Sequence, residues 1–231
     1  MLFTGRAQGN LSPGVGDDPA AVAARQAALA AAAEVVAAAW MTQVHGTTVA
    51  VLDHLPAGPL PATDGVVTDR PGLALAVLAA DCVPVLAEDP VAGVIGAGHA
   101  GRRGAAAGLL PALIEAMAGR GARPDRVELT LGPAICGRCY EVPAQLQAEV
   151  EAQLPGSAVT TWAGTSGLDL RAGLVAAAGR LGVSSVTVDP RCTREDLGLF
   201  SHRRDAPTGR QAGLIWRPGP TSGGPARHAT R

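Results

Sequence analysis

Three separate segments of the sequence each place a metal-binding side chain beside small residues or a turn. The side chains are those of His45, Cys82 and His99, and the neighbouring glycine, alanine and proline residues allow a ligand to approach closely. A thiolate and two neutral imidazoles are good zinc ligands, and three protein ligands leave a fourth position open for water or substrate. These residue types are therefore candidates for a catalytic metal site, although their spacing alone is weak evidence for one. Taken singly, however, each residue is more typical of a packed core position than of a ligand.

Arginine side chains supply candidate anion-binding groups. A guanidinium forms bidentate hydrogen bonds with phosphate, and a role of this kind is favoured over plain surface charge for Arg103 and Arg204. Asp81 directly precedes a predicted ligand and would point to the opposite side if its segment were a strand. A structural hydrogen-bonding role for Asp81 is therefore at least as well supported as proton transfer, and the sequence assigns no general acid.

The remaining three cysteines allow two interpretations. Cys136 and Cys139 have the Cys-x-x-Cys spacing of a redox pair or of half a zinc clamp. A second pair is missing, because Cys192 is the only other cysteine outside the predicted metal site. Structural thiols are therefore favoured. Four cysteines are also too few for a disulfide scaffold in a chain of 231 residues.

The elements that must position these residues follow from periodicity and turn signals. An alanine-rich helix is predicted over residues 20–39, started by carboxylates and a proline at Asp17, Asp18 and Pro19. Short β-branched runs separated by proline and glycine predict strands over residues 47–52, 65–68, 73–78, 83–87, 91–97, 127–131, 183–188 and 211–216. Further helices are predicted over residues 101–119, 142–154 and 168–181.

This pattern predicts a mixed α/β (α+β) protein with a sheet core flanked by helices. A single domain over residues 1–216 is expected, and the Pro- and Gly-rich residues 217–231 are expected to be a disordered tail. A net charge of −1 without a dense basic run argues against a nucleic-acid partner. The sequence shows neither a signal peptide nor an apolar stretch of the roughly 20 residues that cross a bilayer, so a cytoplasmic location without a membrane partner is predicted.

A series of motifs along the chain carries a family resemblance. They are Gln-Val-His-Gly at 43–46, Ala-Ala-Asp-Cys-Val-Pro-Val-Leu at 79–86, Gly-His-Ala-Gly-Arg-Arg-Gly at 98–104, Leu-Gly-Pro at 131–133, Cys-Tyr-Glu-Val at 139–142, Leu-Asp-Leu at 168–170, Cys-Thr at 192–193, Phe-Ser-His-Arg-Arg-Asp at 200–205 and Thr-Gly-Arg at 208–210. In this order they resemble the signatures of the multicopper polyphenol oxidase laccase-domain family. Many members of that family are described as purine nucleoside phosphorylases. The resemblance extends over nearly the whole chain.

The resemblance implies both a site and an activity. The matching His, Cys and His of the family bind the metal, which places zinc on His45, Cys82 and His99. Substrate binding by Arg6, Arg103 and Arg204 is implied as well. The implied activity is phosphorolysis of adenosine, inosine, guanosine or methylthioadenosine, together with adenosine deamination. Purine nucleoside and phosphate are then the small-molecule partners, and the oligomeric state is not implied.

Three other functions stay open beside the phosphorylase. Copper-dependent oxidation of phenols would use the same ligands, since His and Cys also suit copper, but five histidines are few for several copper ions. Hydrolytic editing of cell-wall precursors and a non-catalytic metal-binding scaffold are the others. The sequence also departs from the family pattern, because Arg102 replaces a usual Trp and His202 a usual aromatic residue. Both departures affect how a substrate ring would be held.

Overall fold

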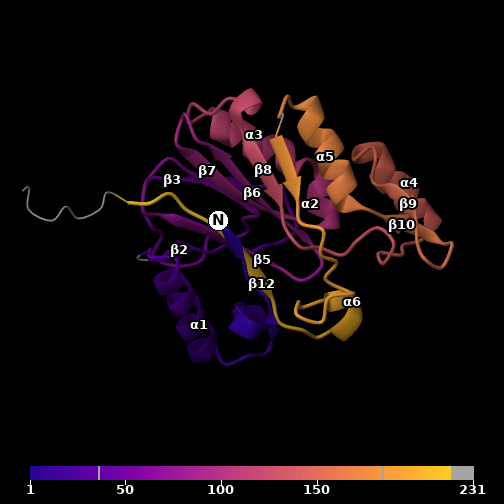
Figure 1. Cartoon of the computed structure of the whole chain (residues 1–231), viewed down its shortest axis with the longest axis horizontal. Helices are drawn as coiled ribbons and strands as arrows, with labels where there is room; N and C mark the ends of the chain where they lie inside the picture. The colour runs from indigo at the N-terminus through magenta and orange to yellow at the C-terminus, as the bar shows by residue number, and fades with distance from the viewer. Residues whose placement is uncertain (36, 184, 220–231) are drawn as a thin grey trace, which may run out of the picture.

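Two β-sheets pack face to face between layers of helices (Figure 1). The computed structural model describes residues 1–35, 37–183 and 185–219. The larger sheet has the strand order β11-β8-β6-β7-β4-β3. Its strands are β3 (Val49–Leu52), β4 (Gly65–Thr68), β6 (Val83–Asp89), β7 (Val94–Ala100), β8 (Glu128–Leu131) and β11 (Ser185–Val188). The smaller sheet has the order β1-β12-β5-β2, from β1 (Leu2–Phe3), β2 (Ala38–Ala39), β5 (Ala74–Ala79) and β12 (Gln211–Ile215).

An aliphatic core lies between the two sheets. Leu75 and Val77 of β5 meet Leu86 of β6 and Ile95 of β7, and all four side chains are fully buried. Burial of apolar surface at roughly 25 cal/mol per Å² makes such an interface the main stabilising contribution. The core therefore depends on Val, Leu and Ile, in keeping with an aromatic content of only 3% in the sequence.

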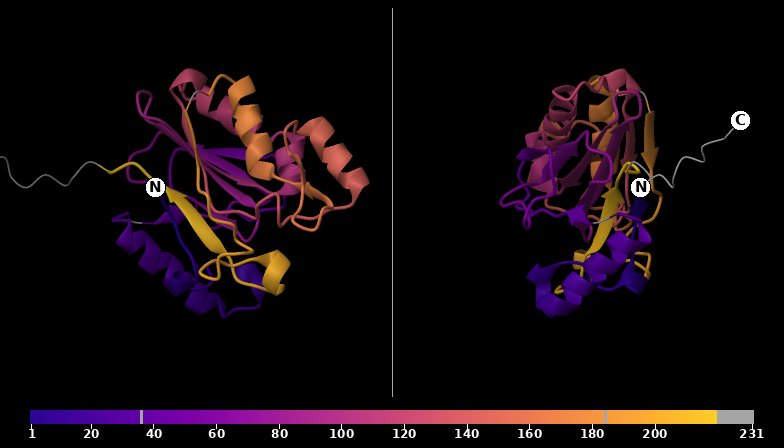
Figure 2. Two further views of the ribbon diagram at one scale, coloured as in Figure 1. Left: turned by 45° about the vertical axis from the view of Figure 1, so that its right-hand side comes forward. Right: turned by 90° about the vertical axis from the view of Figure 1, so that its left-hand side faces the viewer.

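Helix α1 covers the outer face of the smaller sheet, and α2, α3 and α5 cover the outer face of the larger one. In both views of Figure 2, the indigo helix α1 and the magenta and orange helices lie on opposite sides of the sheets. The covering helices are α2 (Arg102–Ala107), α3 (Leu109–Ala118) and α5 (Leu170–Arg180). Helix α4 (Ala144–Gln153) and a hairpin of β9 (Ala158–Thr160) and β10 (Ser166–Leu168) extend the larger layer, and α6 (His202–Asp205) is a single turn.

The first helix begins as predicted but ends early. The Asp18 carboxylate accepts the Ala20 N–H and Pro19 is the first helical residue of α1 (Pro19–Ala32). The prediction that this helix continues to Ala39 is wrong, because Ala38 and Ala39 pair with β5 as strand β2. Pairing and burial in the sheet override the helix propensity of alanine here.

Two other predicted helices also need correction. The helix predicted over residues 101–119 is two helices, separated at Gly108, whose φ of 98° is incompatible with a continuous helix. The helix predicted from Leu168 starts later, because Leu168 pairs with Ala158 in the hairpin and the Asp169 carboxylate caps α5 by accepting the Ala172 N–H. All the predicted strands occur. The strand over residues 65–68 has the predicted bounds, the others differ at one or both ends, and the mixed α+β class is confirmed.

The chain remains attached to the fold just beyond the predicted domain end. Arg217 donates from Nη1 to the Gly93 carbonyl at 2.6 Å, and its own carbonyl accepts the Gly72 N–H. The remainder of the predicted disordered tail, residues 220–231, lies outside the described residues. Among the described residues, no helix is long and apolar enough to cross a membrane.

Candidate metal centre and substrate pocket

The structure brings the three predicted ligands together. One ligand atom each from His45, Cys82 and His99 lies within 4.8 Å of the others. The Cys82 Sγ is 3.8 Å from His45 Nε2, and the two imidazole rings meet edge to face with centroids 4.7 Å apart. These separations suit a single ion held by all three side chains.

Strand register explains how distant residues converge. In the antiparallel pair β6 and β7, Pro84 lies opposite His99, so the turn containing Cys82 runs beside the end of β7. The same turn connects β5 of the smaller sheet to β6 of the larger sheet. His45 lies in the loop between β2 and β3 and has a φ of 62°, in the left-handed region. The two sheets together therefore build the centre.

Asp64 holds two of the ligands in place. Its buried carboxylate accepts backbone N–H bonds from Val44, His45 and Gly46 at 2.8–3.1 Å, which fixes the left-handed loop. The same carboxylate accepts a hydrogen bond from His99 Nδ1 at 2.8 Å, so that the other ring nitrogen of His99, Nε2, is left for a metal. Burial alone would raise the pKa of Asp64, but the bonds from His99 and the backbone lower it to about 2. Asp64 is thus an ionised positioning group.

The ligands carry shifted pKa values that favour a thiolate. Burial alone would raise the pKa of the Cys82 thiol, but hydrogen bonds with His45 and His99 outweigh it and lower the pKa to about 6. Burial would lower the pKa of His99, whereas its bonds with Asp64 and Cys82 raise it to about 9. In the absence of a metal, these shifts favour a Cys82 thiolate paired with a cationic His99.

This pairing predicts how zinc binding depends on pH. Between about pH 6 and 9 zinc must displace the His99 proton, and below about 6 it must displace the Cys82 proton as well. Zinc affinity is therefore expected to rise about tenfold per pH unit from 6 to 9, and more steeply below 6. Chelator competition across this range measures the slope. An affinity that is constant from pH 7 to 9 would contradict the assignment.

Gly101 leaves the space that the ligands occupy. A Cβ at this position would lie 2.5 Å from His45 Cδ2 and 3.1 Å from Cys82 Sγ, although the φ of −72° is ordinary for any residue. We expect Gly101→Ala to displace His45 and to weaken zinc binding about 10- to 100-fold. Gly179→Ala is the matched control, because an added methyl group there meets no atom within 4 Å. Equal zinc affinities in the two variants would show that Gly101 has no such role.

A cavity of about 890 Å³ opens onto the ligands. It extends from Val22 and Gln26 on α1 to Arg102 and Arg103 at the start of α2, and Tyr140 forms another part of its wall. This volume falls in the range of small-molecule sites. The pocket therefore combines a metal-binding corner with apolar and cationic walls.

The three predicted substrate arginines lie in different places. Arg103 lines the pocket, and among the described residues its guanidinium has no hydrogen-bond or ion-pair partner. Arg204 is outside the lining, and its guanidinium donates to Asp205 and to the carbonyls of Thr193, Arg194, Asp196 and Leu199.

Arg6 also lies outside the lining. It pairs with Asp205, donates to the Leu199 carbonyl, and stacks over the Phe200 ring at 4.9 Å. The structure thus brings one of the three predicted arginines to the pocket. The other two bind Asp205 of α6 and backbone carbonyls of the segment that precedes α6.

Several pocket residues belong to the family motifs but received no functional assignment from the sequence. Tyr140, Arg203 and Arg210 line the cavity, and the Arg203 guanidinium stacks over the Tyr140 ring at 5.0 Å. Asp64 was missed as well, although a lone carboxylate directly before a buried strand is a usable signal. Asp81 has a φ of 87° and bonds Thr193 Oγ1 and the Arg203 N–H, so its segment is a turn and its contacts are structural.

Comparison with known protein families gives one extended match. Residues 4–218 match the model of a family described as "Multi-copper polyphenol oxidoreductase laccase". A protein of Mycobacterium tuberculosis (strain ATCC 25618 / H37Rv) named as a purine nucleoside phosphorylase is 55% identical over 209 residues, covering 90% of this chain and 84% of that protein. A Streptomyces coelicolor protein with the same name is 52% identical over 211 residues, covering 90% and 87%.

Solved structures share the same fold. YlmD from Geobacillus stearothermophilus superposes with a TM-score of 0.84 at 31% identity, over 90% of this chain and 84% of that one. The Neisseria meningitidis protein NMB0706 superposes with a TM-score of 0.81 at 33% identity, over 91% and 86%. The packed sheets that assemble the three ligands are therefore an arrangement that these relatives have in common with this chain.

Proposed function

The chain belongs to the multi-copper polyphenol oxidoreductase laccase family, and we propose that it is a zinc-dependent purine nucleoside phosphorylase. Adenosine, inosine, guanosine and methylthioadenosine are its proposed nucleosides, with phosphate as co-substrate. Adenosine deamination is proposed as a second reaction of the same site. Relatives named as purine nucleoside phosphorylases support the first reaction.

One observation carries the proposal: a three-residue group suited to a metal ion shares one cavity with Arg103, whose guanidinium has no partner among residues 1–35, 37–183 and 185–219. The donor set fits zinc, because the Cys82 thiol ionises readily and Asp64 orients His99 with Nε2 free. When bound, zinc supplies Lewis-acid polarisation and activation of water at neutral pH. Copper would use similar ligands.

Phosphorolysis needs an anion held against the sugar. A phosphate oxygen forms a bond to the anomeric carbon while the bond from that carbon to the purine nitrogen breaks and its electron pair leaves with the base. The Arg103 guanidinium is proposed to bind and orient the phosphate, which it can contact in a bidentate manner. Arg210 and Arg203 are further cationic groups on the wall. Tyr140, over which the Arg203 guanidinium stacks, is the aromatic residue proposed to contact the purine.

The proposal is tested by product analysis of the purified protein with adenosine and inosine, each with and without phosphate. Phosphorolysis gives free base and ribose 1-phosphate only when phosphate is present, whereas deamination converts adenosine to inosine in both conditions. Turnover of neither nucleoside by zinc-loaded protein would overturn the proposal. Oxidation of phenols by copper-loaded protein would instead support the oxidase alternative.

Substitution of Arg103 tests the phosphate assignment. Arg103→Ala is expected to raise the KM for phosphate about 10- to 100-fold, since a hydrogen-bonded charge is lost, and to leave adenosine deamination nearly unchanged. Arg103→Lys keeps the positive charge but lacks the planar guanidinium, so its KM for phosphate should lie between those of the wild type and Arg103→Ala. Steady-state kinetics with varied phosphate measure the effect. An unchanged KM in both variants would make Arg103 a surface charge.

A further inference from the structure

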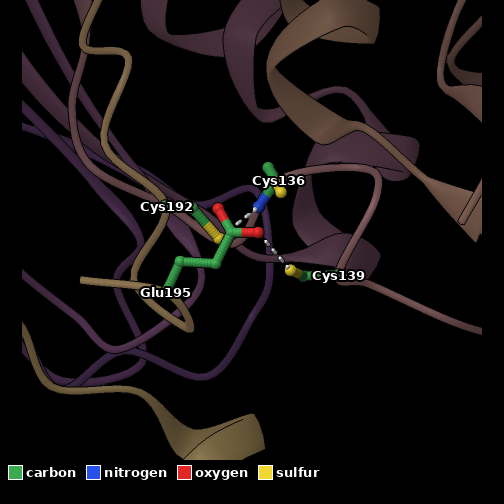
Figure 3. Close-up of side chains that lie close together, drawn as sticks. All are labelled: Cys136, Cys139, Cys192 and Glu195. Carbon is green, nitrogen blue, oxygen red and sulfur yellow. Dashed lines mark hydrogen bonds between the residues drawn. The ribbon is translucent and has the colours of Figure 1, made fainter. Parts of the chain in front are cut away.

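A second group of metal-binding side chains lies outside the pocket. Figure 3 shows Cys136, Cys139, Cys192 and Glu195 pointing toward one another, and one ligand atom from each lies within 4.8 Å of the others. Cys139 and Cys192 are buried, Cys136 is half-buried and Glu195 is exposed. The sequence alone favours structural thiols here because a second cysteine pair is missing. The structure supplies the missing half as Cys192 and Glu195, which have the same spacing.

The fold brings the two halves together through neighbouring strands. β8 and β11 are paired in parallel, with Leu131 opposite Val188, so the segments that follow them leave the same edge of the sheet. An isolated parallel bridge between Ala134 and Cys192 continues this pairing. The ladder of the larger sheet thus fixes the relative position of the two halves.

Each half is a tight turn that directs two side chains to one side. The Cys139 and Tyr140 N–H groups donate to the Cys136 carbonyl at 3.0 Å, and the Glu195 N–H donates to the Cys192 carbonyl at 3.2 Å. The Cys136 N–H also donates to Cys192 Sγ at 3.3 Å. Cys139 Sγ lies 3.3 Å from Glu195 Oε1, which completes the group.

We propose that Cys136, Cys139, Cys192 and Glu195 bind one zinc ion as a structural site separate from the substrate pocket. Four protein ligands leave no open position, which distinguishes a structural zinc site from a catalytic one. Three sulfur ligands select zinc over magnesium or calcium, which prefer oxygen. The cation also compensates the buried negative charge that three thiolates would otherwise create.

The position of this site indicates what the ion stabilises. Ile135 and Tyr140, on either side of the first turn, line the substrate pocket. Thr193, next to Cys192, donates from Oγ1 to Asp81 at 2.5 Å, and the Ile135 N–H donates to the Asp81 carbonyl. The zinc would therefore hold together a wall of the pocket and support the turn that carries the Cys82 ligand.

Zinc content and zinc coordination test the proposal independently of any activity. Native mass spectrometry and elemental analysis of the full chain, purified under reducing conditions, should give two zinc ions per chain. Cys82→Ser should keep the zinc ion of the four-residue site, and Cys192→Ser should keep the zinc ion of the pocket. X-ray absorption of the zinc left in Cys82→Ser should show a sulfur-rich shell with distances of about 2.3 Å. Glu195→Gln changes an exposed ligand, so it should fold and bind this zinc more weakly.

Two outcomes would overturn the proposal. One is Cys82→Ser protein that is folded by circular dichroism and free of zinc after incubation with zinc and removal of the excess. The other is a wild-type mass two hydrogens lower under the same reducing conditions, which would indicate a disulfide among these thiols. If Cys192→Ser does not fold, the zinc content of Cys82→Ser and the zinc affinity of Glu195→Gln still decide the question.

Discussion

Alanine in place of His45, Cys82 or His99 is expected to remove most of the zinc from the pocket and to lower nucleoside turnover by at least about 100-fold. A three-ligand site that loses one ligand keeps two, which hold zinc far more weakly. Double substitutions should lose little more than single ones, because members of one catalytic unit are strongly non-additive. Zinc content, melting temperature and adenosine turnover of the three single variants measure these effects together.

His202→Ala is the matched control for this prediction. His202 lines the same cavity but is not in the three-residue ligand group, so its loss should leave zinc bound in the pocket. If the three residues were only packed core residues, turnover would survive at least one substitution and losses would follow the melting temperature. A stable variant without pocket zinc and with full turnover would remove the metal from the mechanism.

Asp64→Asn is expected to damage both the fold and the metal site. The carboxylate accepts three backbone N–H bonds and one from His99 Nδ1, and an amide group can accept through only one of its two terminal atoms. Leaving buried donors without acceptors should cost about 2–4 kcal/mol of unfolding free energy. Loss of the bond that orients His99 should also lower zinc affinity about 10- to 100-fold. Denaturant unfolding and zinc competition measure the two effects.

Asp89→Asn separates these two effects. Asp89 is also a fully buried aspartate, and it accepts N–H bonds from Val91, Ala92 and Arg123 at the opposite end of β6 from Cys82. Its substitution should therefore destabilise the protein and leave zinc affinity unchanged. If Asp64→Asn behaves like Asp89→Asn, then Asp64 stabilises a loop and does not position His99.

Sequence patterns predict the parts of this protein that depend on local chemistry. The Asp18 cap and the β-branched strands were predicted because each depends on neighbouring residues. The early end of α1 was missed because β2 exists only through its pairing with β5, which is a tertiary interaction. The break at Gly108 was missed because glycine inside an apolar helical pattern does not by itself show where the chain turns.

In the candidate site, too, the sequence predicts residue identities but not the contacts that depend on the tertiary structure. Residue type and family resemblance identified His45, Cys82 and His99, and the structure places them together. They did not reveal that the Arg204 guanidinium faces backbone carbonyls, because the direction of a side chain depends on loops far away in the sequence. Asp64 was missed for a related reason, since its function depends on bonds to the loop that carries His45.

The order of strands in the smaller sheet has a consequence for synthesis on the ribosome. β12 (Gln211–Ile215) lies between β1 and β5, so β1 has no strand partner until the chain has been translated past residue 215. Until then, one edge of β5 presents unpaired backbone groups to solvent. An exposed strand edge is a template for pairing with other chains. The nascent protein is therefore open to association with neighbouring chains, or to a chaperone, until β12 inserts.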